Sequence, residues 1–143
     1  MNDEEIYGRF KLHPVRLNGV LDKQKTSELI EQWDELFHQP AASSHTSIVY
    51  VWATDRPIPR LRGHSNIIYI GKTVRSIRAR YRRGDILKEL PDWSVKRYTH
   101  IISSFGPISF ILAHCENPKD MEKQFIGAYY REHLESPPFN RQS

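Results

Sequence analysis

Two short apolar runs, each containing one tyrosine, constrain the fold of this chain most. They are Ile48-Val49-Tyr50 and Tyr69-Ile70-Gly71. Short runs rich in β-branched and aromatic residues are typical of buried strands. Lys72, Thr73 and an arginine-dense stretch with helical spacing follow the second run directly. Two strands and a basic helix would bring two phenols, a lysine and an arginine onto adjacent elements, a combination that suits attack on a phosphodiester.

The positive charge is concentrated in one part of the chain. Residues 1–45 hold 5 Lys and Arg against 8 Asp and Glu, whereas residues 46–143 hold 16 against 9. The sequence pI is about 9.3. A basic body of this kind indicates a polyanionic partner, and we expect that partner to be nucleic acid.

Length and composition exclude several classes of protein. The 143 residues fit one domain with a short appendage. No apolar run approaches the ~18 residues of a membrane span, so we expect no membrane partner. The acidic start of the chain does not resemble a secretory signal, and the single Cys115 cannot form an internal disulfide. These features predict a cytoplasmic protein.

The patterning of apolar and polar residues predicts an α/β fold. Residues 54–65 contain two prolines and three arginines, and we expect them to form a long basic loop. The order of the remaining elements predicts a small three-stranded sheet of antiparallel type flanked by helices. The expected strands are 47–53, 66–70 and 108–114, and the expected helices are 76–83, 92–105 and 117–134.

Residues 1–45 are predicted to form an N-terminal extension. Residues 9–20 alternate in polarity and could form an edge strand or an extended arm. Residues 23–38 are predicted to be an amphipathic helix capped by Asp22, followed by a linker over 39–44. A lone helix of this length is marginal in water, so it must pack on the body of the chain or on a second subunit. Its apolar residues are Leu29, Trp33, Leu36 and Phe37.

The two tyrosine-containing runs resemble the motifs of the GIY-YIG nuclease superfamily, in which a Gly-Ile-Tyr strand precedes a Tyr-Ile-Gly strand. The second motif is intact as Tyr69-Ile70-Gly71, and the first, Ser47-Ile48-Val49-Tyr50, keeps the tyrosine but has no glycine. Three later family elements follow in order: an apolar residue before an arginine, a helical glutamate before an apolar residue, and Pro-Pro-x-Asn. They are Ile77 and Arg80, Glu122 and Ile126, and residues 137–140. The resemblance covers about residues 46–141 and makes 46–143 a nuclease domain.

The resemblance implies a metal-dependent endonuclease that hydrolyses DNA phosphodiester bonds, of restriction or phage type. A tyrosine-activated water would attack phosphorus, Arg80 would stabilise the developing charge, and Mg²⁺ or Mn²⁺ on Glu122 would assist the leaving oxygen. Lys72 would lower the pKa of a tyrosine, and Asn140 would hydrogen-bond a phosphate or a phenol. No small-molecule cofactor is expected. The implied catalytic residues are Tyr50, Tyr69, Lys72, Arg80, Glu122 and Asn140, with Glu122 as the metal ligand.

The other arginines of the basic body are expected to bind the DNA backbone, because a guanidinium stays charged and grips phosphate bidentately. One group lies in the expected 54–65 loop, and the other lies around the expected basic helix. They are Arg56, Arg60, Arg62, Arg75, Arg78, Arg82 and Arg83.

The sequence leaves several alternatives open. Many family members carry a histidine or tyrosine four residues after the arginine, where this chain has Gly84, so Tyr81 or His100 is a candidate for that role. Which tyrosine acts as the base is also open. The alternative function is a catalytically inactive nucleic-acid-binding module of the same fold, and a third is a regulatory partner that docks through residues 23–38. A double-strand break would require a homodimer or sequential nicking.

Overall fold

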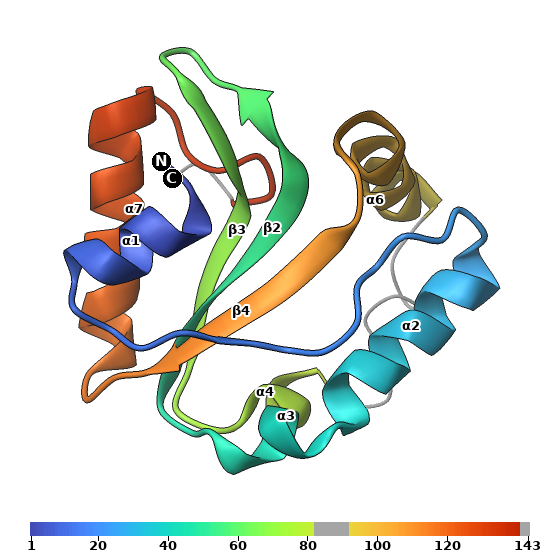
Figure 1. The fold of residues 1–143 in the computed structure, drawn as a ribbon, viewed down its shortest axis with the longest axis horizontal. Helices are drawn as coiled ribbons and strands as arrows, with labels where there is room; N and C mark the ends of the chain where they lie inside the picture. The colour runs from blue at the N-terminus through green and yellow to red at the C-terminus, as the bar shows by residue number, and fades with distance from the viewer. Residues whose placement is uncertain (82–91, 141–143) are drawn as a thin grey trace.

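A four-stranded antiparallel sheet lies between two layers of helices (Figure 1). The computed structural model describes residues 1–81 and 92–140. The strand order is β1 (Val15–Arg16), β4 (Ile108–His114), β2 (Ile48–Pro59) and β3 (His64–Thr73). The predicted α/β class and antiparallel pairing are confirmed, but the predicted number of strands is wrong because the sheet has four.

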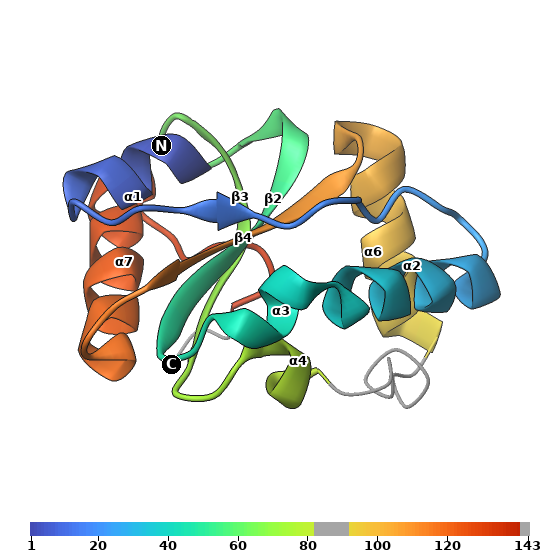
Figure 2. The same ribbon diagram turned by 60° about the horizontal axis from the view of Figure 1, so that its bottom comes forward.

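The additional strand, β1, comes from the segment that alternates in polarity. Val15 pairs with Leu112 and Arg16 with Ile111, which makes β1 an edge strand beside β4 (Figure 2). The pairing continues beyond the strand, where the N–H of Leu17 donates to the carbonyl of Phe110 at 3.0 Å. The N-terminal segment is therefore an integral part of the sheet.

The predicted 54–65 loop is wrong, because β2 and β3 form a hairpin through most of it. β2 continues to Pro59, and β3 begins at His64 after a turn in which Gly63 has a φ of +72°. Pairing between β2 and β4 ends at Thr54. Pro57 and Pro59 lie beyond that point, where β2 pairs on one side only, so their missing N–H groups cost little there.

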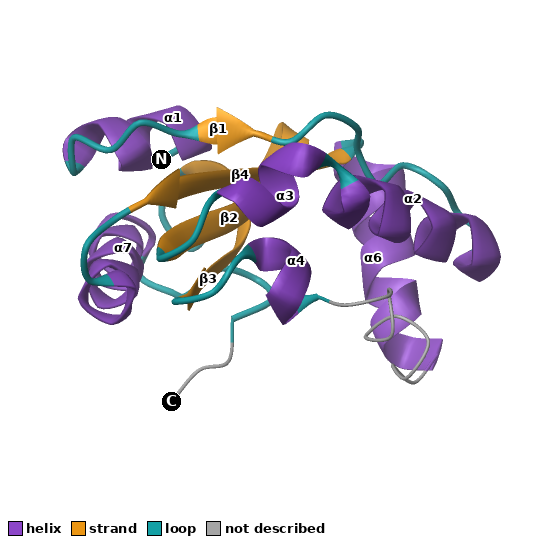
Figure 3. Cartoon of the chain, turned by 90° about the horizontal axis from the view of Figure 1, so that it is seen from below, coloured by secondary structure: helices purple, strands orange, loops and turns teal. Residues whose placement is uncertain are grey.

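One face of the sheet is covered by α2 (Thr26–His38), α3 (Pro40–Ser44), α4 (Ile77–Arg80) and α6 (Asp92–Phe105) (Figure 3). The four predicted apolar residues of α2 are each 1% exposed, so the helix packs on the body of its own chain. The ring of Trp33 stacks on that of Trp52 in β2, with centroids 5.2 Å apart. These contacts decide between the two predicted partners of the helix.

Two details of the segment around α2 differ from expectation. The N-cap position of α2 is Lys25, which makes no side-chain capping bond, and Asp22 instead accepts a hydrogen bond from Gln32. Residues 40–44, predicted to be linker, form the short helix α3 with Pro40 in its first turn. Proline is well tolerated there because the first N–H groups of a helix have no intrahelical partner. A proline that suggested a linker therefore begins a helix.

The opposite face is covered by α1 (Asp3–Arg9) and α7 (Pro118–His133). Asn117 caps α7 as predicted, and its side chain accepts from the N–H of Asp120. No helix was predicted over α1. It buries Ile6 and Tyr7, and the Tyr7 hydroxyl donates to the carbonyl of Ile111 at 2.9 Å.

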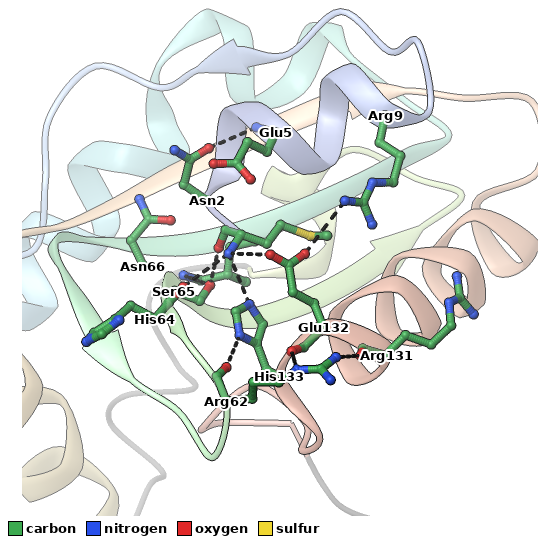
Figure 4. Close-up of polar contacts among 12 residues, drawn as sticks. Asn2, Glu5, Arg9, Arg62, His64, Ser65, Asn66, Arg131, Glu132 and His133 are labelled. Carbon is green, nitrogen blue, oxygen red and sulfur yellow. Dashed lines mark hydrogen bonds and ion pairs between the residues drawn. The ribbon is translucent and has the colours of Figure 1, made fainter.

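The start of α1 is held by a buried polar cluster at the end of α7 (Figure 4). The α-amino group of Met1 donates to the carbonyl of His64 at 3.1 Å and lies 3.3 Å from Glu132 Oε1. It is also 3.1 Å from Nε2 of His133, whose Nδ1 lies 2.8 Å from the carbonyl of Arg62. A carbonyl only accepts, so the His133 proton is on Nδ1 and Nε2 accepts from the ammonium. This assignment makes the buried His133 ring neutral.

Within residues 1–81 and 92–140, no helix is both long and apolar enough to cross a membrane.

Candidate active site

Tyr50 lies near the start of β2, between β4 and β3, and belongs to the core cluster beneath α2, α4 and α6. Its cross-strand partner in β3 is Gly71. A Cβ atom at residue 71 would lie 2.5 Å from Cζ of Tyr50, closer than real Cβ contacts allow. The glycine of the second motif thus makes room for the tyrosine of the first.

The Tyr50 hydroxyl pairs with that of Tyr81, which follows α4, at 2.9 Å. Burial is the main cause that raises the pKa of both phenols, and it raises the pKa of Tyr81 to about 12. The pKa of Tyr50 rises further because the neighbouring Tyr81 adds to the effect of burial. Hydrogen bonds from Tyr50 and Trp52 lower the pKa of Tyr81. Tyr81 is therefore the more acidic phenol of the pair, and either hydroxyl can be the donor in the hydrogen bond between them.

The short helix α4 places Arg80 beside these phenols. The Ser76 hydroxyl accepts from the N–H of Ala79 at 3.2 Å and begins the helix where the sequence predicts it. Cζ of Arg80 is 5.1 Å from the centroid of the Tyr81 ring, and the side chain is exposed. Its positive charge opposes the rise in pKa of both Tyr50 and Tyr81. Arg80 thus combines contact with the phenol pair and access to solvent.

Tyr69 lies on the same face of the sheet. Its cross-strand partner is Trp52, and directly opposed residues of an antiparallel pair point to the same side. The rings of Tyr69 and Tyr50 have centroids 6.1 Å apart and an interplanar angle of 39°. Tyr69 is half-buried, whereas Tyr50 is 1% and Tyr81 7% exposed. Of the three phenols, Tyr69 is the one most accessible to a substrate.

Lys72 and Glu122 lie on the other face of the sheet. Lys72 pairs with Val49, which belongs to the core cluster beneath α7. Glu122 is on α7, where burial raises its pKa and the charge of Lys72 lowers it. The predicted catalytic set is therefore divided: Tyr50, Tyr69 and Arg80 on one face, and Lys72 and Glu122 on the other. Because β3 is the outermost strand, a substrate could contact both groups around its outer edge.

Asn140 lies at that outer edge. Its Oδ1 accepts from the N–H of Ile70, and its Nδ2 donates to the carbonyl of the same residue, both at 2.9 Å. The hydrogen bond of Asn140 to a phosphate or a phenol stays a prediction, and both ends of its amide contact the backbone of Ile70, next to Tyr69.

The predicted DNA-binding arginines form two groups. Arg75 and Arg78 are exposed at the turn after β3 and on α4, close in sequence to Arg80. Arg56 lies toward the other end of β2, about 20 Å from Tyr50 along an extended strand, and Arg60 and Arg62 lie farther away in the turn that follows β2. Arg82 and Arg83 lie outside the described residues, as does Gly84.

The guanidinium groups of the hairpin contact other parts of the same chain. Arg60 forms an ion pair of 2.7 Å with Glu135. Arg62 donates to the carbonyls of Glu132, at 2.7 Å, and of Arg131. Arg56 donates to the carbonyl of Ser104 at 3.0 Å. Cations are favourable at helix C-termini, so Arg62 stabilises the C-terminal end of α7 through these carbonyl groups.

A metal ion at this site would have Glu122 as its carboxylate ligand. Across residues 1–81 and 92–140, no three His, Cys, Asp or Glu side chains form a group that could hold a metal ion. A single carboxylate still suits Mg²⁺, which usually keeps several waters and takes phosphate oxygens of the substrate as ligands. The half-buried carboxylate of Glu122, whose pKa the charge of Lys72 lowers, is a ligand of this type.

The sequence did not identify Trp52 as part of the site. The sequence could have indicated it, because Trp52 is two residues from Tyr50 in the same expected strand, and alternate residues of a strand lie on the same face. Tyr81 and His100 were the two candidates for the role that many members of the resembled family give to the position of Gly84. Tyr81 contacts Tyr50, and His100 is an exposed residue of α6.

Comparison with known proteins gives no match: no protein-family model, curated protein or solved structure is significantly similar to this chain.

Proposed function

We propose that this chain is an endonuclease of the GIY-YIG type that hydrolyses DNA phosphodiester bonds. The observation that supports this most is the placement of Tyr50, Tyr69 and Arg80, which adjacent elements bring together around one hydrogen-bonded phenol pair. These three residues come from both tyrosine motifs and from the helix that follows. Exposed Arg75 and Arg78 beside them add positive charge for a phosphate backbone.

Each residue has a role that its surroundings favour. Tyr69, the most accessible phenol, contacts and orients the attacking water. Tyr50 is hydrogen-bonded to Tyr81 and is held beneath the site. Arg80 binds a phosphate oxygen and stabilises the charge that develops in the transition state. A divalent cation bound by Glu122, Mg²⁺ or Mn²⁺, would supply stabilisation of the leaving oxygen.

Lys72 belongs with Glu122 in this proposal rather than with the tyrosines. Its charge opposes the effect of burial on the Glu122 pKa, which favours the carboxylate form needed for metal binding. The substrate strand then lies around the edge of β3, with the phenols and Arg80 on one side and Glu122 on the other.

The alternative is a nucleic-acid-binding module of the same fold without catalysis. The observation that favours it is the division of the predicted catalytic residues between two faces of the sheet, together with the 1% exposure of Tyr50. Such a module would keep the basic surface and bind DNA without cutting it.

A plasmid-nicking assay with and without Mg²⁺ separates the two functions. We expect Mg²⁺-dependent conversion of supercoiled plasmid to nicked or linear forms, and Glu122→Ala should abolish it while DNA affinity stays within about tenfold. Glu116→Ala, which removes an exposed carboxylate just before α7, is the matched control and should cut normally. DNA binding without any cleavage would establish the alternative, and full cleavage by Glu122→Ala would remove Glu122 from the mechanism.

A further inference from the structure

The segment that follows α7 covers part of the outer edge of β3, at Ile68 and Ile70. The N–H of Phe139 donates to the carbonyl of Ile68 at 2.8 Å, and Asn140 pairs with Ile70 through its side chain. Ile68 and Ile70 are the two neighbours of Tyr69 in the chain. The backbone on both sides of Tyr69 is therefore fixed by residues about seventy positions away.

Asn140 takes the place of a peptide group in a neighbouring strand. A side-chain amide offers one acceptor and one donor on the same planar group, as a peptide does. Here the acceptor takes the N–H of Ile70 and the donor reaches its carbonyl, each at 2.9 Å. An edge strand otherwise presents such groups unpaired, so this contact gives β3 a local partner on its free side.

Helix α6 holds this segment in position. Arg97 donates to the carbonyl of Pro138 at 2.9 Å, and its guanidinium carbon lies 4.3 Å from the centroid of the Phe139 ring. Tyr98 contacts the same ring edge-to-face, with centroids 5.1 Å apart. Cation–π and edge-to-face contacts both have preferred geometries, so they fix the Phe139 ring as well as burying it.

We propose that Arg97 and Phe139 are positioning residues for the cleavage reaction: they hold Asn140 against Ile70, and Asn140 in turn fixes the backbone that carries Tyr69. This inference rests on the proposed function. It gives Asn140 the task of holding the strand rather than binding phosphate, and it connects α6 to the accessible phenol through one continuous set of contacts.

The experiment measures the strand edge and the reaction separately in the full-length chain. Amide hydrogen exchange of Ile70 reports the contact with Asn140, and single-turnover cleavage and DNA affinity report function. The variants are Phe139→Ala, Asn140→Asp, Arg97→Ala and Arg97→Lys. Asn140→Asp keeps the acceptor for the Ile70 N–H but removes the donor to its carbonyl. Arg97→Lys keeps the charge but loses the planar group over the ring. Lys96→Ala, which removes an exposed cation from the same helix, is the control.

We expect Phe139→Ala and Asn140→Asp to accelerate Ile70 exchange about tenfold and to lower the cleavage rate about tenfold, with DNA affinity changed less than about twofold. Arg97→Ala should act in the same direction, Arg97→Lys should restore part of both values, and Lys96→Ala should change neither.

Three results would overturn the proposal. Faster exchange with an unchanged cleavage rate would show that the contact serves stability alone. A lost rate with unchanged exchange in Asn140→Asp would show that Asn140 acts directly on the substrate. Weaker DNA binding as the main effect of the Arg97 variants would make Arg97 a DNA contact. Absence of cleavage by the unmodified chain would refute the proposed function, and the exchange data would still decide whether the segment holds the edge of β3.

Discussion

The side chain of Tyr50 fills the space that a side chain at Gly71 would need: a Cβ atom at residue 71 would lie 2.6 Å from the Tyr50 hydroxyl oxygen and 2.5 Å from Cζ. The ring is 1% exposed and surrounded by other aromatic rings, so it has little room to move. The glycine is thus required by the tyrosine across the sheet and not by its own backbone, which has no positive φ.

Gly71→Ala should therefore lower the thermal stability, with a loss of about 1–3 kcal/mol from overpacking, and should displace the Tyr50 hydroxyl from Tyr81. Gly8→Ala is the matched control, because no atom outside the neighbouring residues and the backbone of the same helix lies within 4 Å of the added Cβ. Alanine is the better helix former, so that change within α1 should be neutral or stabilising. Thermal melts of both variants check the prediction. Equal stability of the two variants would contradict the close contact.

Tyr50→Phe and Tyr69→Phe separate the hydroxyls from the rings. Each change keeps the packing and removes the polar group, so we expect rate losses of about 10²-fold or more with little change in melting temperature. Single-turnover cleavage and melting curves measure the two effects. If melting collapses while the folded fraction still cuts at the normal rate, the tyrosines serve the core alone.

Arg80 and Arg78 are exposed on the same short helix and should differ in effect. Arg80→Ala should lower the turnover rate more than the affinity, because the guanidinium acts on charge that develops in the transition state. Arg78→Ala should mainly weaken binding and reduce the slope of log affinity against log salt by roughly 0.9 per lost phosphate contact. The same pattern for both variants in both assays would refute the distinction.

Lys72→Met tests the pairing of Lys72 with Glu122. The charge of Lys72 lowers the pKa of Glu122, so its removal should let that pKa rise. If the carboxylate form is required, the acidic limb of the cleavage pH profile should move to higher pH. Lys119→Met, at an exposed position on α7, should leave the profile in place. A raised KM with an unshifted profile would instead make Lys72 a DNA contact.

His133 should make the stability depend on pH. Burial lowers its pKa, and the ring faces the Met1 ammonium and Arg60 as well as Glu132. The folded chain therefore binds this proton less well than the unfolded chain, so stability is fully present above the unfolded pKa of about 6.5 and falls as pH drops below it. His133→Gln should flatten this dependence, whereas His100→Gln, at an exposed position, should not. Denaturant unfolding at several pH values measures it, and an unchanged slope in His133→Gln would contradict it.

Long periodic segments were predictable from the sequence. β4 matches the expected strand, α6 matches the expected helix, and α7 begins after its predicted cap at Asn117. The short helix α1 was not predictable, because its seven residues are too few to show a helical period. β1 was predicted in part, because it lies in the alternating segment 9–20, for which an edge strand was one of two expectations. The extension of β2 and β3 into residues 54–65 was not predicted, because Pro57 and Pro59 are typical of loops, although a strand paired on one side tolerates them.

The distribution of the candidate catalytic residues over two faces of the sheet could have been predicted in part. Tyr69 and Lys72 are three residues apart in one strand, and alternation therefore places them on opposite faces. The contacts of Arg60 and Arg62 with the end of α7 could not have been predicted, because they depend on how a hairpin meets a helix some seventy residues later.

An N-terminal and a C-terminal segment of the chain each cover one side of the three-stranded unit formed by β4, β2 and β3, the second of them only in part. β1 covers β4 on one side, and the segment containing Phe139 and Asn140 covers part of β3 on the other. Each of these covers shortens the unpaired strand along which two copies of this protein could associate, either as an ordered dimer or as an aggregate. An assembly able to cut both strands of a duplex would have to join through helices or through the hairpin tip, where the side chain of Leu61 is 75% exposed.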